Sequence, residues 1–410
     1  MGGGMRLYIG VDWADAADAV WVEDEDGKKL LSRSVPHTVD GMRDWGHWLD
    51  ERRAEGHEVW AAIERPEGRT VDFLLDHGVV VFPINPRVVD RVRDRFRMSG
   101  AKSDPFDARV LASFLRTDHG HLSPLRPSSE YAQELKGLTR DYARHVRQQT
   151  RLLNQVTATL KAYYPRALEI CDDLKSEWAR AFLREYPTPD ALARLTERRW
   201  QRWARDHRLR AERPVELWPI IQRPQLAIPA HVVRVKARLL RALLEQLAVT
   251  IRTVQAYTET ITDFFAGMPG PNWATSLPGA ASGTTVPSVY AELGDAAGRW
   301  QTFRHLQGCS GTVPVTDRSG KVANVKFRFA CNHYLRQAVQ QFAFQSLTKS
   351  EWARAYYDRC RKRGHRHHHA LRALAAKWLK IIFVLWSRQA AYDENRHLAT
   401  MARQQLRQSA

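Results

Sequence analysis

Two long stretches with apolar residues at steps of three and four constrain the fold of this chain most strongly. The first covers about 129–164 and the second about 231–266. Such steps place apolar side chains on one helix face, so each stretch predicts one long amphipathic helix. We expect the two helices to pack on each other as an antiparallel coiled coil, or on those of a partner chain in a dimer. Between them, about 168–229 is rich in Arg and Trp and predicts a small helical insert.

These helices divide the 410 residues into three expected domains. They are an α/β domain at 1–125, a coiled-coil and dimerisation region at 126–268 that holds the insert, and a mainly α domain at 269–410. The longest apolar run, Ile381–Trp386, is far shorter than the ~20 residues of a membrane-spanning helix, so we expect no membrane partner. Four widely spread cysteines fit a reducing cytoplasm and do not fit a zinc finger.

The N-terminal domain alternates between the residue patterns of strands and of helices. Three strands come first, a helix capped by Thr38 follows, and two more strands alternate with helices. This order predicts a mixed sheet with antiparallel first hairpins, in which the fourth strand lies beside the first. We expect strands at 6–12, 19–24, 29–35, 57–64 and 79–84, and helices at about 38–54, 68–77, from 86, and 104–117.

Four carboxylates stand where this order brings strand ends and a helix start together. Asp12 ends the first strand and Glu64 ends the fourth. Asp104 and Asp107 share one face at the opening of a helix. A single Asp at a helix start is commonly only a cap. Four acids together repel one another unless cations lie among them, and Mg²⁺ or Mn²⁺ prefers such oxygen ligands. The set therefore favours metal-dependent phosphoryl transfer.

Positive charge is concentrated toward the C-terminus. The chain has 63 Lys and Arg against 45 Asp and Glu, a net charge of +18, and half of that excess lies in the last sixty residues. Cations that neutralise phosphates release counterions, so we expect a nucleic acid partner. In the densest run, 359–369, a helix presents His365 and His369 at best as a two-ligand metal site, which makes phosphate contacts the better interpretation. The expected contacts are Arg361, Lys362, Arg363 and Arg366.

Several segments resemble one family of mobile-element proteins, the IS110 insertion-sequence transposases. Four of them are similar to that family's Asp-Glu-Asp-Asp motifs: Gly10–Ala14, Ala62–Gly68, Ile84–Pro86 and Lys102–Arg109. The resemblance continues in the second half with Ser276–Gly279, Ala291–Asp295, Gly311–Pro314 and Arg318–Gly320. The first two of these resemble the family's helix-hairpin-helix-like segment, and the last two together resemble its serine motif.

The resemblance implies a site-specific DNA recombinase of an insertion sequence. The N-terminal domain would have a ribonuclease-H-like fold, as in RuvC-type junction resolvases, and would bind Mg²⁺ or Mn²⁺ through Asp12, Glu64, Asp104 and Asp107. A bridge RNA would pair with target and donor double-stranded DNA. Homodimers would assemble into a tetramer, with the carboxylates of one subunit and the serine of another forming each active site. Such a protein is expected in the bacterial cytoplasm, associated with the nucleoid.

Two serines compete as nucleophile. The family's serine follows its Gly-Thr-Val-Pro segment, which selects Ser319 over Ser310. Ser319 lies in a turn-type segment, where Gly320 allows a close backbone approach. We expect carboxylate-bound ions to activate the hydroxyl or the phosphate and give a covalent phosphoserine link. The cations expected to neutralise the phosphate are Arg318, Lys321, Lys326 and Arg328.

Two other functions stay open on the sequence. A metal-dependent hydrolytic junction nuclease of the RuvC type would use the same carboxylates and no serine. A non-enzymatic nucleic-acid-binding protein would use its acidic residues only for structure. The tryptophans of the insert could stack on unpaired bases, but a role in the core is the commoner one.

Overall fold

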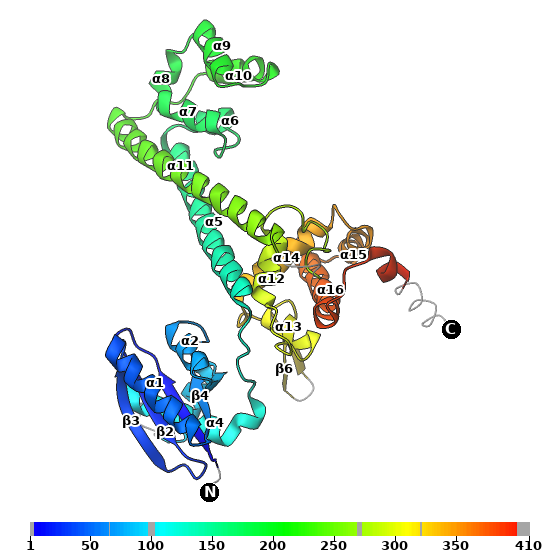
Figure 1. Cartoon of the computed structure of the whole chain (residues 1–410). Coiled ribbons are helices and arrows are strands. Elements are labelled where there is room, and N and C mark those ends of the chain that lie inside the picture. The colour runs from blue at the N-terminus through cyan, green and yellow to red at the C-terminus, as the bar shows by residue number, and fades with distance from the viewer. Residues whose placement is uncertain (1–3, 65, 97–102, 269–272, 320–321, 400–410) are drawn as a thin grey trace. The chain divides into compact units, whose positions relative to one another are not determined.

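The computed structural model describes residues 4–64, 66–96, 103–268, 273–319 and 322–399, and for 317–319, 322 and 323 it describes the backbone alone. The chain forms two compact units, Met1–Pro127 and Ser128–Ala410 (Figure 1). Within the described ranges, no helix combines the length and the hydrophobicity needed to cross a membrane.

The first unit is built on a five-stranded mixed sheet. Its strands are β1 (Arg6–Asp12), β2 (Ala17–Glu23), β3 (Lys29–Pro36), β4 (Glu58–Ile63) and β5 (Val80–Pro83). The strand order is β3-β2-β1-β4-β5, in which β1 pairs antiparallel with β2 and parallel with β4. The predicted mixed sheet and the predicted neighbourhood of the first and fourth strands are confirmed.

Helices cover both faces of this sheet. They are α1 (Val39–Ala54), α2 (Arg69–Asp76), α3 (Pro86–Arg93) and α4 (Asp104–Asp118), followed by a 3₁₀ turn at His119–His121. The hydroxyl of Thr38 accepts a 3.1 Å hydrogen bond from the amide of Gly41, as expected for the cap of α1. On one face, Ile9 of β1 packs with residues of α1 and α2, and on the other face Tyr8 packs with residues of α3 and α4.

Two long antiparallel helices dominate the second unit. They are α5 (Glu130–Tyr163) and α11 (Ala230–Ala266). The ring of Tyr131 stacks on Phe264 at 4.6 Å between centroids, and His145 lies 5.3 Å from Tyr257, so the residue numbers run in opposite directions along the pair. The apolar stripes seen in the sequence therefore cover each other within one chain.

The insert between these helices is helical, as predicted. It consists of α6 (Arg166–Ile170), α7 (Glu177–Glu185), α8 (Pro189–Ala193), α9 (Glu197–Asp206) and α10 (Glu212–Gln222). Trp200 and Trp203 are buried in its core, where their rings stack 5.7 Å apart. These two tryptophans therefore stabilise the insert and do not present free faces to bases.

The C-terminal part is mainly helical. It contains α12 (Thr285–Leu293), α13 (Phe303–Cys309), α14 (His333–Ser346), α15 (Glu351–Lys362) and α16 (His367–Arg388), together with the antiparallel hairpin of β6 (Val315–Ser319) and β7 (Val322–Lys326). Two local expectations are wrong. The segment before Ser319 is a strand instead of a turn, and His365 precedes α16 and shares no helix with His369.

Glu292 on α12 joins three helices of this unit. Its carboxylate receives a bidentate hydrogen bond from Arg140 on α5, at 2.7 and 3.1 Å, and a third from the Asn332 side chain at 2.7 Å. Glu292 is only 2% exposed. A buried carboxylate needs such partners, because an unpaired charge away from water is costly. This part of the Ala291–Asp295 motif thus holds α5 against the C-terminal helices.

Candidate active site

A glycine on β1 brings helix α4 unusually close to the sheet. A Cβ atom at Gly10 would overlap the carbonyl oxygen of Ala108 and lie 2.7 Å from the amide nitrogen of Ala112. Only glycine leaves room for this backbone approach. Because Gly10 is two residues before Asp12, and Ala108 directly follows Asp107, the contact places the first turn of α4 beside the end of β1.

Three of the four predicted carboxylates act electrostatically on the fourth, Asp12. Burial and, in decreasing order of size, the negative charges of Asp107, Asp104 and Glu64 together raise the pKa of Asp12 to about 6. Asp12, Glu64 and Asp107 are partly buried, and Asp104 is exposed. The fold therefore brings acids that are far apart in the sequence within electrostatic range of Asp12.

Arg93, on α3, also belongs to this site, although no pattern in the sequence predicted it. Its Nε donates a 2.8 Å hydrogen bond to Oδ1 of Asp107, and one Nη lies 2.7 Å from Oδ1 of Asp90. The residue is 8% exposed, and its positive charge lowers the pKa of Asp12. In this arrangement the guanidinium neutralises part of the charge of the acidic cluster.

The four carboxylates offer the oxygen ligands that a hard divalent cation prefers, but they do not lie close enough together to form a complete metal site. Among the residues that the structure describes, no three His, Cys, Asp or Glu side chains lie close enough to hold a metal ion. The oxygen chemistry and the raised pKa of Asp12 nevertheless fit Mg²⁺ or Mn²⁺, because a cation would relieve the repulsion among the acids. The residues that could hold it are Asp12, Glu64, Asp104 and Asp107.

Ser319 is the last residue of β6, in the second unit, and its backbone pairs with Val322. Gly320 and Lys321 lie outside the described residues, and Arg318 is described by its backbone alone. Lys326 ends β7 and is exposed, and Arg328 donates a 3.4 Å hydrogen bond to the carbonyl of Val313.

The competing serine, Ser310, is fully buried, with an exposed fraction of 0%. Its hydroxyl lies 3.0 Å from the carbonyl oxygen of Gln307 and 3.0 Å from the hydroxyl of Thr312. These contacts satisfy the group inside the fold. A hydroxyl so placed cannot meet a phosphodiester strand unless the fold opens, which removes Ser310 as a competitor.

The basic run of the sequence surrounds the turn from α15 to α16. Arg361, Lys362, Arg363 and Arg366 are all exposed there. One Nη of Arg361 donates a 2.9 Å hydrogen bond to the carbonyl of His365, which shapes the turn. The rings of His365 and His369 stack at 4.3 Å. The run thus forms an accessible cationic surface.

Comparison with known proteins defines the class to which this fold and these sites belong. Residues 9–165, which contain all four carboxylates, match a family model described as a transposase. Residues 273–358, which contain the hairpin, match the model of the IS116/IS110/IS902 family of transposases. The protein is a transposase.

Individual relatives narrow the class. The chain is 32% identical to the candidate mini-circle transposase for IS117 of Streptomyces coelicolor over 97% of its own length and 98% of the relative's. It is 25% identical to a 43.6 kDa protein of insertion element IS110 from the same species, over 95% and 96% of the two chains. A candidate transposase of Sinorhizobium fredii, y4uE, is 38% identical over 50% of this chain and 58% of its own. The chain belongs to the IS116/IS110/IS902 family, whose proteins act in DNA transposition.

Proposed function

We propose that this transposase recombines DNA with two cooperating groups, a divalent-metal site at the four carboxylates and a nucleophilic serine at position 319. In this proposal the first unit is a ribonuclease-H-like domain of the RuvC type, and α5 and α11 form a coiled coil that dimerises. A bridge RNA selects target and donor DNA, and two dimers form the working tetramer. The observation that carries the proposal is the convergence of Asp12, Glu64, Asp104 and Asp107 on one electrostatic cluster.

The metal half of the proposal rests on that convergence. Asp12, Glu64, Asp104 and Asp107 would hold the ion, with Arg93 releasing Asp107 as it binds. A divalent ion at this position supplies charge neutralisation for a phosphodiester and lowers the pKa of an attacking hydroxyl. The strand order, with β1 between an antiparallel and a parallel neighbour, supports a ribonuclease-H-like arrangement.

The serine half rests on the contrast between the two serines. Ser310 is buried and hydrogen-bonded, whereas Ser319 is the last residue of strand β6. In the step we propose, the Ser319 oxygen forms a bond to the scissile phosphorus and the bond from phosphorus to the leaving strand oxygen breaks. The serine proton is lost to solvent, and the leaving oxygen is protonated. The reverse attack by a strand hydroxyl rejoins DNA and restores the serine.

A trapping experiment tests the nucleophile. Purified protein is incubated with Mg²⁺ and a DNA junction that carries the element ends, and covalent protein–DNA adducts are separated on denaturing gels. We expect Ser319→Ala to abolish the adducts while DNA binding persists. Thr316→Ala, which removes an exposed hydroxyl from the same strand, serves as the matched control and keeps them. Adducts that persist in Ser319→Ala, or free 5′-phosphate ends without adducts, would instead indicate another nucleophile or hydrolysis.

A second experiment tests the guide and the assembly. The protein is purified from cells that carry its native flanking DNA, and the RNA that remains bound is sequenced. The net charge of +18 supports a large polyanion as partner. We expect one structured noncoding RNA from the element, and light scattering should give the mass of a dimer that doubles when both DNA partners are added. A monomer without specific RNA would contradict this part of the proposal.

A further inference from the structure

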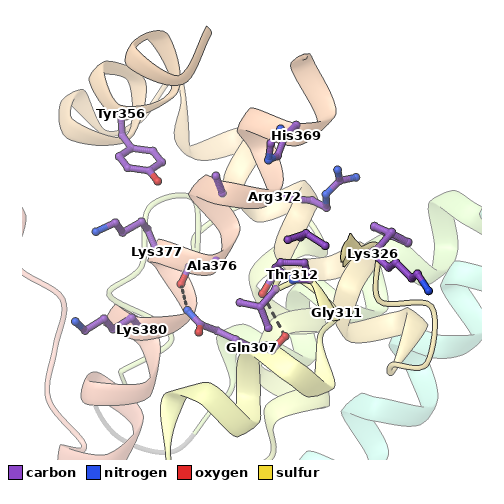
Figure 2. Close-up of a pocket in the computed structure, with 15 residues that line it drawn as sticks. Gln307, Gly311, Thr312, Lys326, Tyr356, His369, Arg372, Ala376, Lys377 and Lys380 are labelled. Atoms are coloured by element: carbon purple, nitrogen blue, oxygen red, sulfur yellow. Dashed lines mark hydrogen bonds between the residues drawn. The ribbon is translucent and has the colours of Figure 1, made fainter. Parts of the chain in front are cut away.

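A cavity of about 580 Å³ lies beside the hairpin of β6 and β7, within the second unit (Figure 2). Four segments form its walls: the end of α13 with the residues that follow it, the end of β7, Tyr356 on α15, and one side of α16. Residues of these walls include Gln307, Thr312, Lys326, Phe327, Arg372 and Lys380. Of the described residues that line the cavity, none is acidic.

Three cations of α16 give the cavity its charge. Arg372, Lys377 and Lys380 follow one another at steps of five and three. In the part of the chain that the structure describes, none of the three forms an ion pair with a carboxylate. Each lies over an aromatic ring instead: Arg372 at 5.0 Å from Phe327, Lys377 at 5.9 Å from Tyr356 and Lys380 at 5.2 Å from Phe303. Their positive charge is therefore positioned but not neutralised.

The remaining wall is shaped to accept more than a small inorganic ion. The side chain of Gln307 is fixed by a 2.7 Å hydrogen bond to the carbonyl of Ala376. Val313, Pro314 and Ala373 add apolar surface. Lys377 and Lys380 are exposed, so a ligand can enter from solvent. Fixed cations beside apolar and aromatic surface suit a nucleic acid strand, which carries phosphates together with sugars and bases.

The position of the cavity relates it to Ser319. Lys326 on β7 pairs with Val315 on β6, and Ser319 lies four steps along β6 from Val315. At ~3.3 Å per residue this is ~13 Å. Phosphates of one strand advance ~3.4 Å per base along a duplex axis, so ~13 Å corresponds to about four nucleotides.

We propose that this cavity binds the phosphodiester backbone of a nucleic acid strand a few nucleotides away from the phosphate that Ser319 attacks. The relation to the attacked phosphate rests on the proposed function, whereas the binding itself rests only on the cavity. Arg372 and Lys380 contact two phosphates of the strand. They lie eight residues apart on one helix, or ~12 Å at ~1.5 Å per residue, a span that covers several phosphates.

Binding of labelled strands tests the cavity. The probes are fluorescein-labelled 20-nucleotide single strands, one of DNA and one of RNA, and affinity is measured by anisotropy across a range of salt concentrations. We expect Arg372→Gln/Lys380→Gln to bind at least one probe about tenfold more weakly. The slope of log affinity against log salt should fall by ~1.4, because two single-strand phosphate contacts are lost. The control Lys349→Gln/Arg388→Gln removes two exposed cations outside the cavity and should leave affinity within twofold.

A second variant guards against an effect of folding. Ala373→Glu places a carboxylate in the cavity wall and should weaken binding to the same probe with an unchanged melting temperature. Loss confined to DNA or to RNA, or loss of both, supports the cavity and identifies the strand. If both cavity variants bind both probes as tightly as the control does, the proposal is overturned. Adduct formation by Ser319→Ala would overturn the nucleophile alone, since that variant is expected to keep normal strand binding.

Discussion

Arg93 on α3 holds Asp107 on α4 through a 2.8 Å hydrogen bond from Nε to Oδ1. The same guanidinium pairs with Asp90, one turn earlier on its own helix. A positive charge inside an acidic cluster has two effects. It reduces the electrostatic repulsion on the ionised carboxylate of Asp12. It also forms a hydrogen bond to an oxygen of Asp107 that a bound cation would use as a ligand. In this structure the protein thus supplies its own counter-ion.

Removal of that counter-ion should strengthen metal binding. Replacement by Arg93→Gln leaves the acids in place with one positive charge fewer, and we expect Mn²⁺ to bind about tenfold more tightly at pH 8, or ~1.4 kcal/mol. Isothermal titration of the full chain measures this affinity. Arg91→Gln, an exposed cation on the same helix, is the matched control. Equal Mn²⁺ affinity in the two variants would show that Arg93 does not compete with the metal.

The raised pKa of Asp12 predicts a pH-dependent stability in the absence of metal. Its pKa of about 6 in the fold lies above the ordinary 3.8, so the fold favours the protonated acid. The ionised acid therefore costs stability above pH 6, and that cost disappears below about pH 4. Asp12→Asn should stabilise the metal-free protein at pH 8 by about 1 kcal/mol, after allowance for the partial exposure of the group. At pH 5 the gain should be about half as large.

Urea denaturation in the presence of EDTA at the two pH values measures this gain. The exposed residue Asp15 provides the control through Asp15→Asn. The same gain in both variants, or a gain that grows as the pH falls, would show that the stability cost does not come from the ionised carboxylate of Asp12. Added Mn²⁺ should reverse the order and make the native Asp12 the more stable form, because a metal that binds only the folded state stabilises it.

The close approach at Gly10 predicts a severe effect from one methyl group. In Gly10→Ala the new Cβ would overlap the backbone of α4, which cannot move without disturbing the sheet core. We expect a loss of at least ~3 kcal/mol in the free energy of unfolding. In the same unit, Gly120→Ala adds its methyl group where no atom lies within 4 Å and should cost less than ~1 kcal/mol. Similar thermal denaturation curves for the two variants would refute the proposed contact.

The buried carboxylate of Glu292 predicts a similar loss in the second unit. In Glu292→Ala the guanidinium of Arg140 and the amide of Asn332 lose their common partner. Breaking a buried pair in this way costs ~3–5 kcal/mol. Glu259→Ala, which removes only a hydrogen bond to Gln255 on the exposed side of α11, should cost under ~0.5 kcal/mol. Calorimetry of both variants distinguishes the two cases, and equal melting temperatures would contradict the role of Glu292.

Much of the architecture could be predicted from periodicity and order. The two long helices could be predicted because their apolar residues recur on one face. Each begins and ends within about a residue of its expected ends. The place of β4 beside β1 follows from three consecutive strands and a helical crossover. This placement also predicted that Asp12 and Glu64 would end adjacent strands.

Features that depend on tertiary contact could not be predicted in the same way. Arg93 looks like any cation on a short amphipathic helix until α4 brings Asp107 to it. Gly10 gives no sign of its contact, because its partner, Ala108, is almost one hundred residues away. The hairpin carried a weak signal, since Val315–Thr316 and Val322–Val325 flank an Asp-Arg-Ser-Gly-Lys sequence, but strands this short are ambiguous without their pairing.

The pair α5 and α11 serves two separate cores. Near one end, Leu135 and Ile261 pack with the C-terminal helices, and toward the other, Leu160 and Leu240 pack with the insert. Among the residues that the structure describes, none belongs to both cores. During evolution the insert (α6–α10) can therefore become longer or shorter, or be replaced, while the β6–β7 hairpin and its cationic cavity keep their packing. The insert and the part of the protein that carries the proposed serine chemistry can therefore change in sequence at different rates.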